Sequence, residues 1–368
     1  MTLGLILALV AVSGSAAVFR REIDWLTTPA LRTAPHAMTA AWQPAWEAAS
    51  RYEAAGEGQW LWELRRPEGE RFAWTGLFRG GEAPAEVFVE TEGGRVLGGR
   101  VLGYHRGAVA FTLRQLHVRL WMGPWGRALV GLTGLLLVLM GVTGYVLARK
   151  APRGPVQGRR AWSRVHAVVG RWTLWFHVVT GVTGAVVGLE VVPGLVARAA
   201  GQGEGRTKSG AGTPSDPRSW RIDLDRAVAM AEGAVSGVVA RAVRMDARSP
   251  VVTVCLDHGS PWIARGASEV RVDLEAGRVE AVWDARQAGA TGRAYDALDP
   301  LHFGYFGEAW GTAAGYAVRV VWCALGLTPA GLAITGTVLW RMRARPGRTR
   351  RETWEDGAAA QAIQRTAG

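Results

Sequence analysis

Cysteine is scarce in this sequence, and its placement matches no metal or disulfide motif. Only Cys255 and Cys323 occur among 368 residues. Cys255 lies in a stretch that predicts a strand and Cys323 in a long apolar run, so we expect no disulfide between them. CxxC pairs, zinc-type spacings and the CxxCH motif of covalently attached haem are all absent. The sequence therefore gives no support for a disulfide framework, a zinc site or a c-type cytochrome.

Motifs for nucleotide binding and hydrolysis are missing as well. The glycine-rich stretches Gly76–Gly81 and Gly201–Gly212 lack the strand, GxGxxG turn and helix of a dinucleotide site. No Ser-His-Asp set, HExxH motif or pair of catalytic carboxylates supports a hydrolase. A permease is also disfavoured, because transporters commonly have broken helices at corresponding positions of their two halves. Here Pro329 interrupts one apolar run, but the run before it has only Pro193, which lies at its end.

Formal charge is almost absent from four long apolar runs. The runs are Thr2–Phe19, Leu129–Ala148, Trp172–Val192 and Ala313–Trp340. Inside them only Glu190 and Arg319 are charged. About 20 apolar residues cross a bilayer as a helix, so the pattern predicts an integral membrane protein with four transmembrane helices in the lipid bilayer. A cleaved signal peptide is the alternative for the first run, but the basic residues that would precede it are missing.

Acidic residues are absent from the basic loop between the second and third runs, and this absence predicts the topology. The loop carries Arg149, Lys150, Arg153, Arg159, Arg160, Arg164 and Arg171, and six further arginines lie within residues 341–351, directly after the fourth run. The positive-inside rule places both regions and both termini in the cytoplasm, and segments 21–112 and 193–297 on the other side. Much of the net charge of +12 therefore sets topology. We expect no nucleic-acid partner, because no binding motif accompanies these arginines.

The chain contains an internal repeat. "LHVRLWMGPWG" (Leu116–Gly126) and "LHFGYFGEAWG" (Leu301–Gly311) share Leu-His, seven intervening residues and Trp-Gly. "VFVETEGGRV" (Val87–Val96) similarly matches "VRVDLEAGRV" (Val270–Val279) as strand, turn and strand. The chain therefore predicts two units, about 1–150 and 160–345, each an outgoing helix, an outside segment, a Leu-His element and a returning helix.

The outside segments each predict four strands and one helix. In the first segment the strands are Gln59–Arg65, Arg71–Phe78, Ala85–Thr91 and Val96–Leu102, with a helix near Met38–Ala55. In the second they are near Val238–Met245, Val251–Asp257, Glu269–Leu274 and Arg278–Trp283. Asp223 is expected to cap a helix over Leu224–Val235, after a flexible linker at Gly201–Pro217.

Together these motifs resemble the PepSY-associated transmembrane proteins, a family that includes bacterial iron-regulated membrane proteins and ferrisiderophore reductases. The resemblance is carried by four [ST]-G motifs, "FRREID", "IDLDRAVAMAEGAV", "VDLEAGRV" and the two Leu-His elements; the [ST]-G motifs are Ser13–Gly14, Thr143–Gly144, Thr183–Gly184 and Thr335–Gly336. It implies an inner-membrane protein with extracytoplasmic α+β PepSY-like domains. In the reductase members it also implies b-type haem held by histidines.

With this resemblance the chain divides into nine segments. They are 1–20 (first transmembrane helix), 21–112 (first extracytoplasmic PepSY-like segment), 113–150 (Leu-His element and second helix), 151–164 (basic cytoplasmic loop), 165–192 (third helix), 193–217 (linker), 218–297 (second PepSY domain), 298–343 (Leu-His element and fourth helix) and 344–368 (cytoplasmic tail).

Four of the seven histidines lie in or beside the apolar runs and are the candidate haem ligands: His117, His166, His177 and His302. His166 and His177 are eleven residues apart, so they share one helix face at roughly 16 Å and need ligand partners on other helices. His177 is the strongest candidate because ionisable groups inside membranes are usually functional. We expect it to pair with His117 or His302 on one iron. His36, His105 and His258 are expected to be surface or loop residues.

Other interpretations of these residues remain open. His166 can be a solvated residue at the inner interface, and His117 and His302 can belong to the interfacial aromatic belt. Arg319 can pair with a haem propionate, bind Glu190 or extend to the outer surface. The repeat also places Leu7 opposite His177 and the equivalent of His166 before Met1, so one site is expected to be intact and one impaired.

The function expected from the sequence is transmembrane electron transfer. One or two b-type haems would carry electrons from quinol or a separate cytoplasmic donor to a ferric siderophore on the outside. Trp60, Trp62, Trp74 or Trp262 would contact that substrate. The alternative is a non-enzymatic membrane-anchored protein whose PepSY segments bind or regulate a partner.

Overall fold

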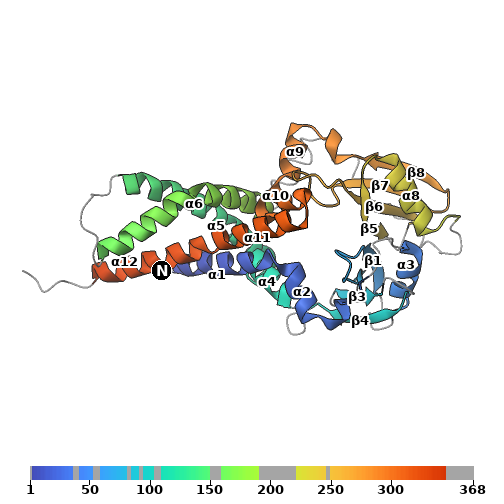
Figure 1. Cartoon of the computed structure of the whole chain (residues 1–368), viewed down its shortest axis with the longest axis horizontal. Helices are drawn as coiled ribbons and strands as arrows, with labels where there is room; N and C mark the ends of the chain where they lie inside the picture. The colour runs from blue at the N-terminus through green and yellow to red at the C-terminus, as the bar shows by residue number, and fades with distance from the viewer. Residues whose placement is uncertain are drawn as a thin grey trace, which may run out of the picture.

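The protein has an elongated helical part and a separate sheet part (Figure 1). The computed structural model describes residues 2–35, 41–52, 59–80, 84–90, 94–102, 109–149, 159–189, 221–245 and 249–344. Glu190, His36, His105, the linker at 193–217 and the tail beyond Ala344 lie outside the described residues.

The helical part is a bundle of long helices lying side by side (Figure 1). Its members are α1 (Thr2–Ala17), α5 (Gly123–Arg149), α6 (Arg159–Gly188), α11 (Thr312–Gly326) and α12 (Thr328–Ala344). The bundle packs tightly where glycines meet: a Cβ added to Gly134 on α5 would lie 2.6 Å from the Gly181 carbonyl oxygen on α6. Small residues allow such close approach of helices in membrane proteins.

Two helical stretches are long and apolar enough to cross a membrane. They are Gly123–Arg149, with mean hydropathy 2.1, and Thr312–Met342, with mean hydropathy 1.6. A third candidate is the bent pair formed by Gly4–Ala17 and Arg20–Thr27, which meet at 71°. Among the described helices α6 does not qualify, although its 30 residues are ample. Four arginines in its first half, together with polar residues such as Thr173 and His177, lower its mean hydropathy.

The sheet part is one antiparallel sheet of eight strands, in the order β4-β3-β2-β1-β5-β6-β7-β8. The first outside segment contributes β1 (Trp60–Arg65), β2 (Trp74–Arg79), β3 (Ala85–Val89) and β4 (Val96–Val101). The second contributes β5 (Val239–Met245), β6 (Val251–Asp257), β7 (Ser268–Asp273) and β8 (Arg278–Trp283). The eight strands lie where the alternating sequence pattern predicts them, and the two segments join through the pairing of β1 with β5.

Two short helices pack on the sheet and complete one hydrophobic core. These are α3 (Trp42–Ser50) and α8 (Leu224–Ala234), and the core includes the fully buried Trp74, Leu64 and Val243. The side chain of Asp223 accepts a hydrogen bond from the Arg226 N–H and caps α8, as the sequence predicts. The sheet halves therefore share their interior as well as their strands.

A buried carboxylate stabilises the junction between β1 and β5. Glu63 on β1 is 2 % exposed and forms ion pairs with Arg65 and with Arg244 on β5. Burial alone would raise the pKa of Glu63, but the two guanidinium groups outweigh that effect and lower it. Beside it, Arg241 bridges Glu68 at 3.0 Å and Asp257 at 3.1 Å, which links the end of β1 to β5 and β6.

Short helices connect the sheet to the bundle. They are α2 (Arg20–Thr27), η1 (Pro29–Leu31), α4 (Val109–Arg119), η3 (Ala285–Gln287), α9 (Ala290–Asp296), α10 (Leu298–Phe303) and η4 (Tyr305–Trp310). The two Leu-His elements therefore fold as short helices, α4 and α10, at the end of the bundle that faces the sheet (Figure 1).

Candidate functional site: a histidine cavity in the helix bundle

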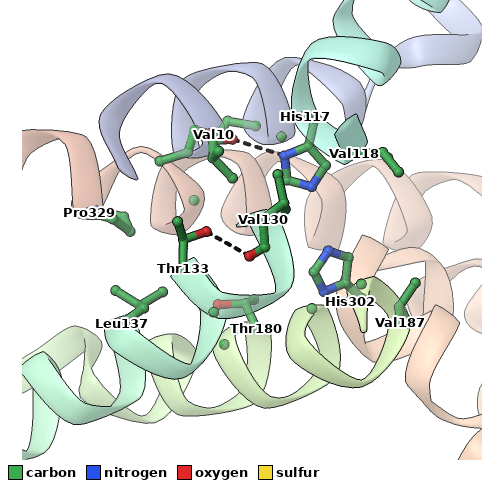
Figure 2. Close-up of a pocket in the computed structure, with 18 of the residues that line it drawn as sticks. Val10, His117, Val118, Val130, Thr133, Leu137, Thr180, Val187, His302 and Pro329 are labelled. Atoms are coloured by element: carbon green, nitrogen blue, oxygen red, sulfur yellow. Dashed lines mark hydrogen bonds between the residues drawn. The ribbon is translucent and has the colours of Figure 1, made fainter. Parts of the chain in front are cut away.

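A largely apolar cavity lies within the bundle, at the end near the sheet. It contains about 1030 Å³ of empty space, part of it open to the surroundings. Its wall is built from α1, α4, α5, α6, α10, α11 and α12 (Figure 2), and its lining includes Val10, Val118, Val130, Leu137, Phe176 and Trp322. His117 and His302 are the two histidines among these described lining residues. Cofactor pockets have mostly apolar walls with a few placed polar groups, so the cavity fits a cofactor in character.

His117 is positioned by α4 against α1. Its Nδ1 lies 2.9 Å from the carbonyl oxygen of Val10. A carbonyl oxygen can only accept, so Nδ1 carries the proton and donates it, and Nε2 keeps a free lone pair. A Cβ on Gly14 would lie 2.5 Å from the His117 ring, so only glycine at this position lets the ring lie flat against α1.

His302 is positioned in the same way by α10 against α6. Its Nδ1 lies 2.9 Å from Thr183 Oγ1, and the Thr183 hydroxyl itself donates to the Val179 carbonyl at 2.7 Å. The hydroxyl hydrogen is therefore engaged, so Thr183 Oγ1 accepts a hydrogen bond that His302 Nδ1–H donates. The Nε2 of His302 therefore keeps a free lone pair. A Cβ added to Gly184 would lie 3.1 Å from Cε1 of the His302 ring, so glycine allows the ring to pack closely against α6.

The two histidines face one another across the cavity (Figure 2), with ring centroids 6.0 Å apart. Each uses Nδ1 to hold its orientation and leaves Nε2 unprotonated. This is the arrangement of metal-binding histidines, in which the second nitrogen donates to an oxygen that fixes the tautomer. Among the described residues no group of three or more His, Cys, Asp or Glu residues comes together. Two imidazoles in an apolar cavity therefore fit haem iron, which histidine nitrogens hold, better than a tetrahedral zinc site.

His177 and His166 lie on α6 and turn toward α12 instead. His177 Nε2 is 2.9 Å from Thr328 Oγ1, and His166 Nδ1 is 2.7 Å from Thr335 Oγ1. The shared helix face predicted for these two histidines is thus the α12-facing side of α6. His177 is 1 % exposed, and its ring contacts Phe176 at 6.2 Å between centroids. The structure brings together His117 and His302, whereas the sequence pairing joined His177 to one of them.

Three of the four [ST]-G motifs lie against a histidine. The glycine of Ser13–Gly14 packs against His117, and the glycine of Thr183–Gly184 packs against His302. A Cβ added to Gly336 would lie 3.7 Å from Cε1 of His166. At Gly144 of the fourth motif an added Cβ would meet nothing within 4 Å among the described atoms. At the other three positions the glycine of the motif therefore leaves room for an imidazole beside the helix.

Arg319 does not line the cavity in the described structure. It is 5 % exposed and forms an ion pair with Glu22 of α2 at 2.9 Å, which the sequence analysis did not predict. Its guanidinium also lies over the Tyr316 ring, 4.4 Å from the centroid. The pair ties the bend after α1 to α11. "FRREID" was recognised as a family motif, but nothing in it indicated a partner 297 positions away.

Several side chains differ from their expected environments. His258, expected on the surface, has a side chain only 3 % exposed and binds Ser268 Oγ at 2.5 Å. Trp74, expected to contact substrate, is fully buried in the core of the sheet part. Trp322 and Phe176 were missed, yet they form part of the cavity wall and contact each other at 5.3 Å. Apolar aromatic residues in a membrane helix carry no local signal that separates a cavity wall from ordinary packing.

Comparison with known proteins identifies the family of this chain. The family model described as PepSY-associated TM region matches residues 1–343. An uncharacterized protein of Pseudomonas aeruginosa is 29% identical over 252 residues, which is 63% of this chain and 63% of that relative. The chain thus spans about three fifths of the length of this relative, whose printed name assigns no activity. With the family model covering nearly its whole length, the chain belongs to the PepSY-associated transmembrane family and is a membrane protein.

Proposed function

We propose that this protein is a b-type haem electron-transfer protein of the bacterial inner membrane that reduces ferric siderophores on the extracytoplasmic side. His117 and His302 would hold one haem. The observation that supports this most is the pair of unprotonated Nε2 atoms facing one another in an apolar cavity. Bound haem would supply one-electron chemistry that none of the described side chains provides.

The proposed membrane arrangement has four spans, with both termini in the cytoplasm. Two of these spans are the helical stretches that are long and apolar enough by themselves. The proposal adds the bent pair α1–α2 and the less apolar helix α6 as the other two. Arg149 at the end of α5 and Arg164 near the start of α6 lie toward the end of the bundle away from the sheet (Figure 1), which the positive-inside rule assigns to the cytoplasm. The sheet would then lie outside, beside the cavity end that carries His117 and His302.

The chain's own residues would do three things. The Val10 carbonyl and Thr183 hydroxyl hold the two imidazoles in the metal-binding tautomer. Apolar side chains such as Val118, Val130 and Leu137 exclude water from the cavity. Electrons would enter from quinol or a cytoplasmic donor, because the sequence has no nucleotide or flavin motif.

Absorption spectroscopy of the purified protein tests the haem site. We expect a Soret band and reduced α-bands, with each of His117→Ala and His302→Ala losing most of the bound haem. His258→Gln, which alters a histidine of the sheet, is the control and should keep it. If the protein is colourless after expression with ample porphyrin, the proposal is wrong and an anchored PepSY binding or regulatory protein takes its place.

The number of haems has its own measurement. His166 and His177 are the imidazoles available for a second haem, each held by a threonine of α12. The molar ratio of haem to protein in the double variant His166→Gln/His177→Gln, compared with the wild type, distinguishes one haem from two. A halved content means two haems, and an unchanged content means that His117 and His302 hold the one haem present.

A further inference from the structure

One residue with a permanent charge lines the histidine cavity. Among the described lining residues Arg127 is the only arginine, and no lysine or carboxylate accompanies it. It lies near the start of α5, at the end of the bundle that faces the sheet. The lining residues that follow it along α5, among them Val130, Thr133 and Leu137, are all uncharged. Within this lining, charge is therefore confined to the sheet end of the cavity.

The position of Arg127 is set by the contact between α5 and α6. Its Nη2 donates a hydrogen bond to the carbonyl oxygen of Val187 at 2.8 Å. The two helices approach closely here, because a Cβ added to Gly188 would lie 2.8 Å from Cα of Gly131. Val187 lies on the same side of the cavity as His302 (Figure 2). The guanidinium is therefore held at the end of the cavity where His302 lies.

The other polar side chains of the described cavity wall use their hydrogens within the protein. The hydroxyls of Ser15, Thr133 and Thr180 each donate to a carbonyl oxygen of their own helix, at 2.7–2.8 Å. The indole N–H of Trp322 donates to a backbone carbonyl of α10 at 3.0 Å. Both histidines use Nδ1–H in the same way. A guanidinium has five N–H donors, more than one carbonyl can accept, so Arg127 is the lining residue suited to an anion.

The proposed cofactor has a matching distribution of charge. Haem b carries two carboxylates, its propionates, on one edge of an otherwise apolar ring. A carboxylate taken out of water needs a charged partner, and arginine can bind it through two parallel hydrogen bonds. Arg319, which the sequence suggested for this role, is instead paired with Glu22 outside the cavity lining. A single cation at one end of an apolar cavity favours one orientation of such a ring.

We propose that Arg127 is a haem-binding residue, which pairs with a propionate and turns the propionate edge of the haem toward the sheet. The uncharged edge of the porphyrin would face the deeper part of the cavity, where Leu137 and Pro329 lie (Figure 2). The assignment rests on the proposed function and deepens it, because it gives the cavity a recognition element that is independent of the iron.

A comparison of haem b with its dimethyl ester tests this assignment. The ester keeps the iron and the ring, but its propionates are uncharged. The haem-free full chain in lipid nanodiscs is titrated with each porphyrin, and binding is followed by the Soret band. The quantity compared is the ratio of the two affinities, since solubility and lipid partitioning then cancel between variants. We expect the preference for haem b to fall about tenfold in Arg127→Gln, as loss of one charge-assisted hydrogen bond does.

Matched variants separate the charge of Arg127 from other effects. Arg119→Gln removes an exposed arginine of α4 that lies outside the cavity lining, and it should leave the ratio unchanged. Arg127→Lys keeps the positive charge without the planar fork, so it should retain part of the preference for haem b. Arg127→Met keeps the length of the side chain and replaces Arg127→Gln if that variant does not fold.

The outcome is distinguishable from that of the haem proposal. A chain that binds neither porphyrin refutes both proposals. A chain that binds haem b with the same affinity ratio in the wild type and in Arg127→Gln keeps the haem site and overturns the role of Arg127. That holds even if both porphyrins bind less tightly to the variant, because Arg127 would then only support the contact between α5 and α6. An equal fall in Arg119→Gln would likewise overturn the role.

Discussion

At the scale of single residues, the glycines of the [ST]-G motifs decide whether an imidazole can approach a helix. Gly14 and Gly144 occupy the same position in this motif, but a Cβ at Gly14 would lie 2.5 Å from His117, whereas a Cβ at Gly144 would meet nothing within 4 Å in the described structure. The same substitution should therefore have opposite effects at the two sites.

Gly14→Ala is expected to displace His117 and break its hydrogen bond to Val10. Forcing a methyl group into a filled site costs about 1–3 kcal/mol, so the melting temperature in detergent should fall and bound haem should decrease. Gly144→Ala, the control, should leave the spectrum unchanged and stabilise α5 slightly, because alanine favours the helix by roughly 0.5–1 kcal/mol. Equal melting temperatures and spectra in the two variants would show that His117 is not held against Gly14.

Glu63 makes a pH-dependent contribution to the stability of the sheet. Its folded-state pKa is lowered, because the ion pairs with Arg65 and Arg244 outweigh the effect of burial. Its stabilisation is therefore complete above the unfolded-state pKa, near 4.3, and is lost as pH falls through the lower folded-state pKa. Glu63→Gln should cost about 1–3 kcal/mol at pH 7, measured by thermal unfolding. The gap between wild type and variant should narrow as the pH falls below the unfolded-state pKa, and a gap independent of pH would refute this account.

Some residues of the candidate site could be predicted from the sequence alone. The repeated Leu-His element identified His117 and His302, because equivalent positions in two units signal a shared role. Their mutual contact was not predictable, since it depends on how α4 and α10 pack against Gly14 and Gly184. For the same reason the partner of Arg319, Glu22, emerged only from the bend that follows α1.

At the scale of elements, the pairing of β1 with β5 holds the two outside segments together. The paired residues are few: Glu63 with Arg244, Leu64 with Val243, and Arg65 with Ala242. Both Leu64 and Val243 are fully buried, so the junction adds side-chain packing to its hydrogen bonds. A substitution that disrupts the pairing of β1 with β5 should therefore destabilise both halves of the sheet.

Val243→Pro is expected to destabilise β2 as well as β6, because proline removes a ladder donor from a central strand. Hydrogen exchange measured by mass spectrometry should show faster exchange in Trp74–Arg79 and Val251–Asp257. Val282→Pro, on the exposed edge strand β8, should affect only its surroundings. Protection of β2 that survives Val243→Pro would mean that the first segment folds independently.

Local elements were largely predictable, but their assembly was not. Alternating side chains indicated all eight strands, and Asp223 indicated the start of α8, because these signals lie within a few residues of each other. The register between Leu64 and Val243 joins residues 179 positions apart, and no local pattern encodes it. The sequence therefore suggested two outside units, and the structure shows a single sheet.

At the scale of the whole molecule, the proposed topology places the sheet outside and the basic ends of the bundle inside. Alkaline phosphatase folds only after export, so truncated fusions report the side of each position. We expect an active enzyme when it is fused after Asp225, and an inactive enzyme when it is fused after Arg149 or after Ala344. Activity at Arg149 would invert the arrangement and place the sheet in the cytoplasm.

The shared sheet has a consequence for biosynthesis. About 170 residues separate Arg65 from Val239, and at 5–20 residues per second the ribosome needs roughly 9–35 s to make them. A β-hairpin forms in about 1–10 μs, so β1 can pair transiently with β2 while its outer edge still has no neighbour. During that interval the unpaired edge is open to strands of other nascent chains, and crowded export of this protein should favour intermolecular pairing at β1.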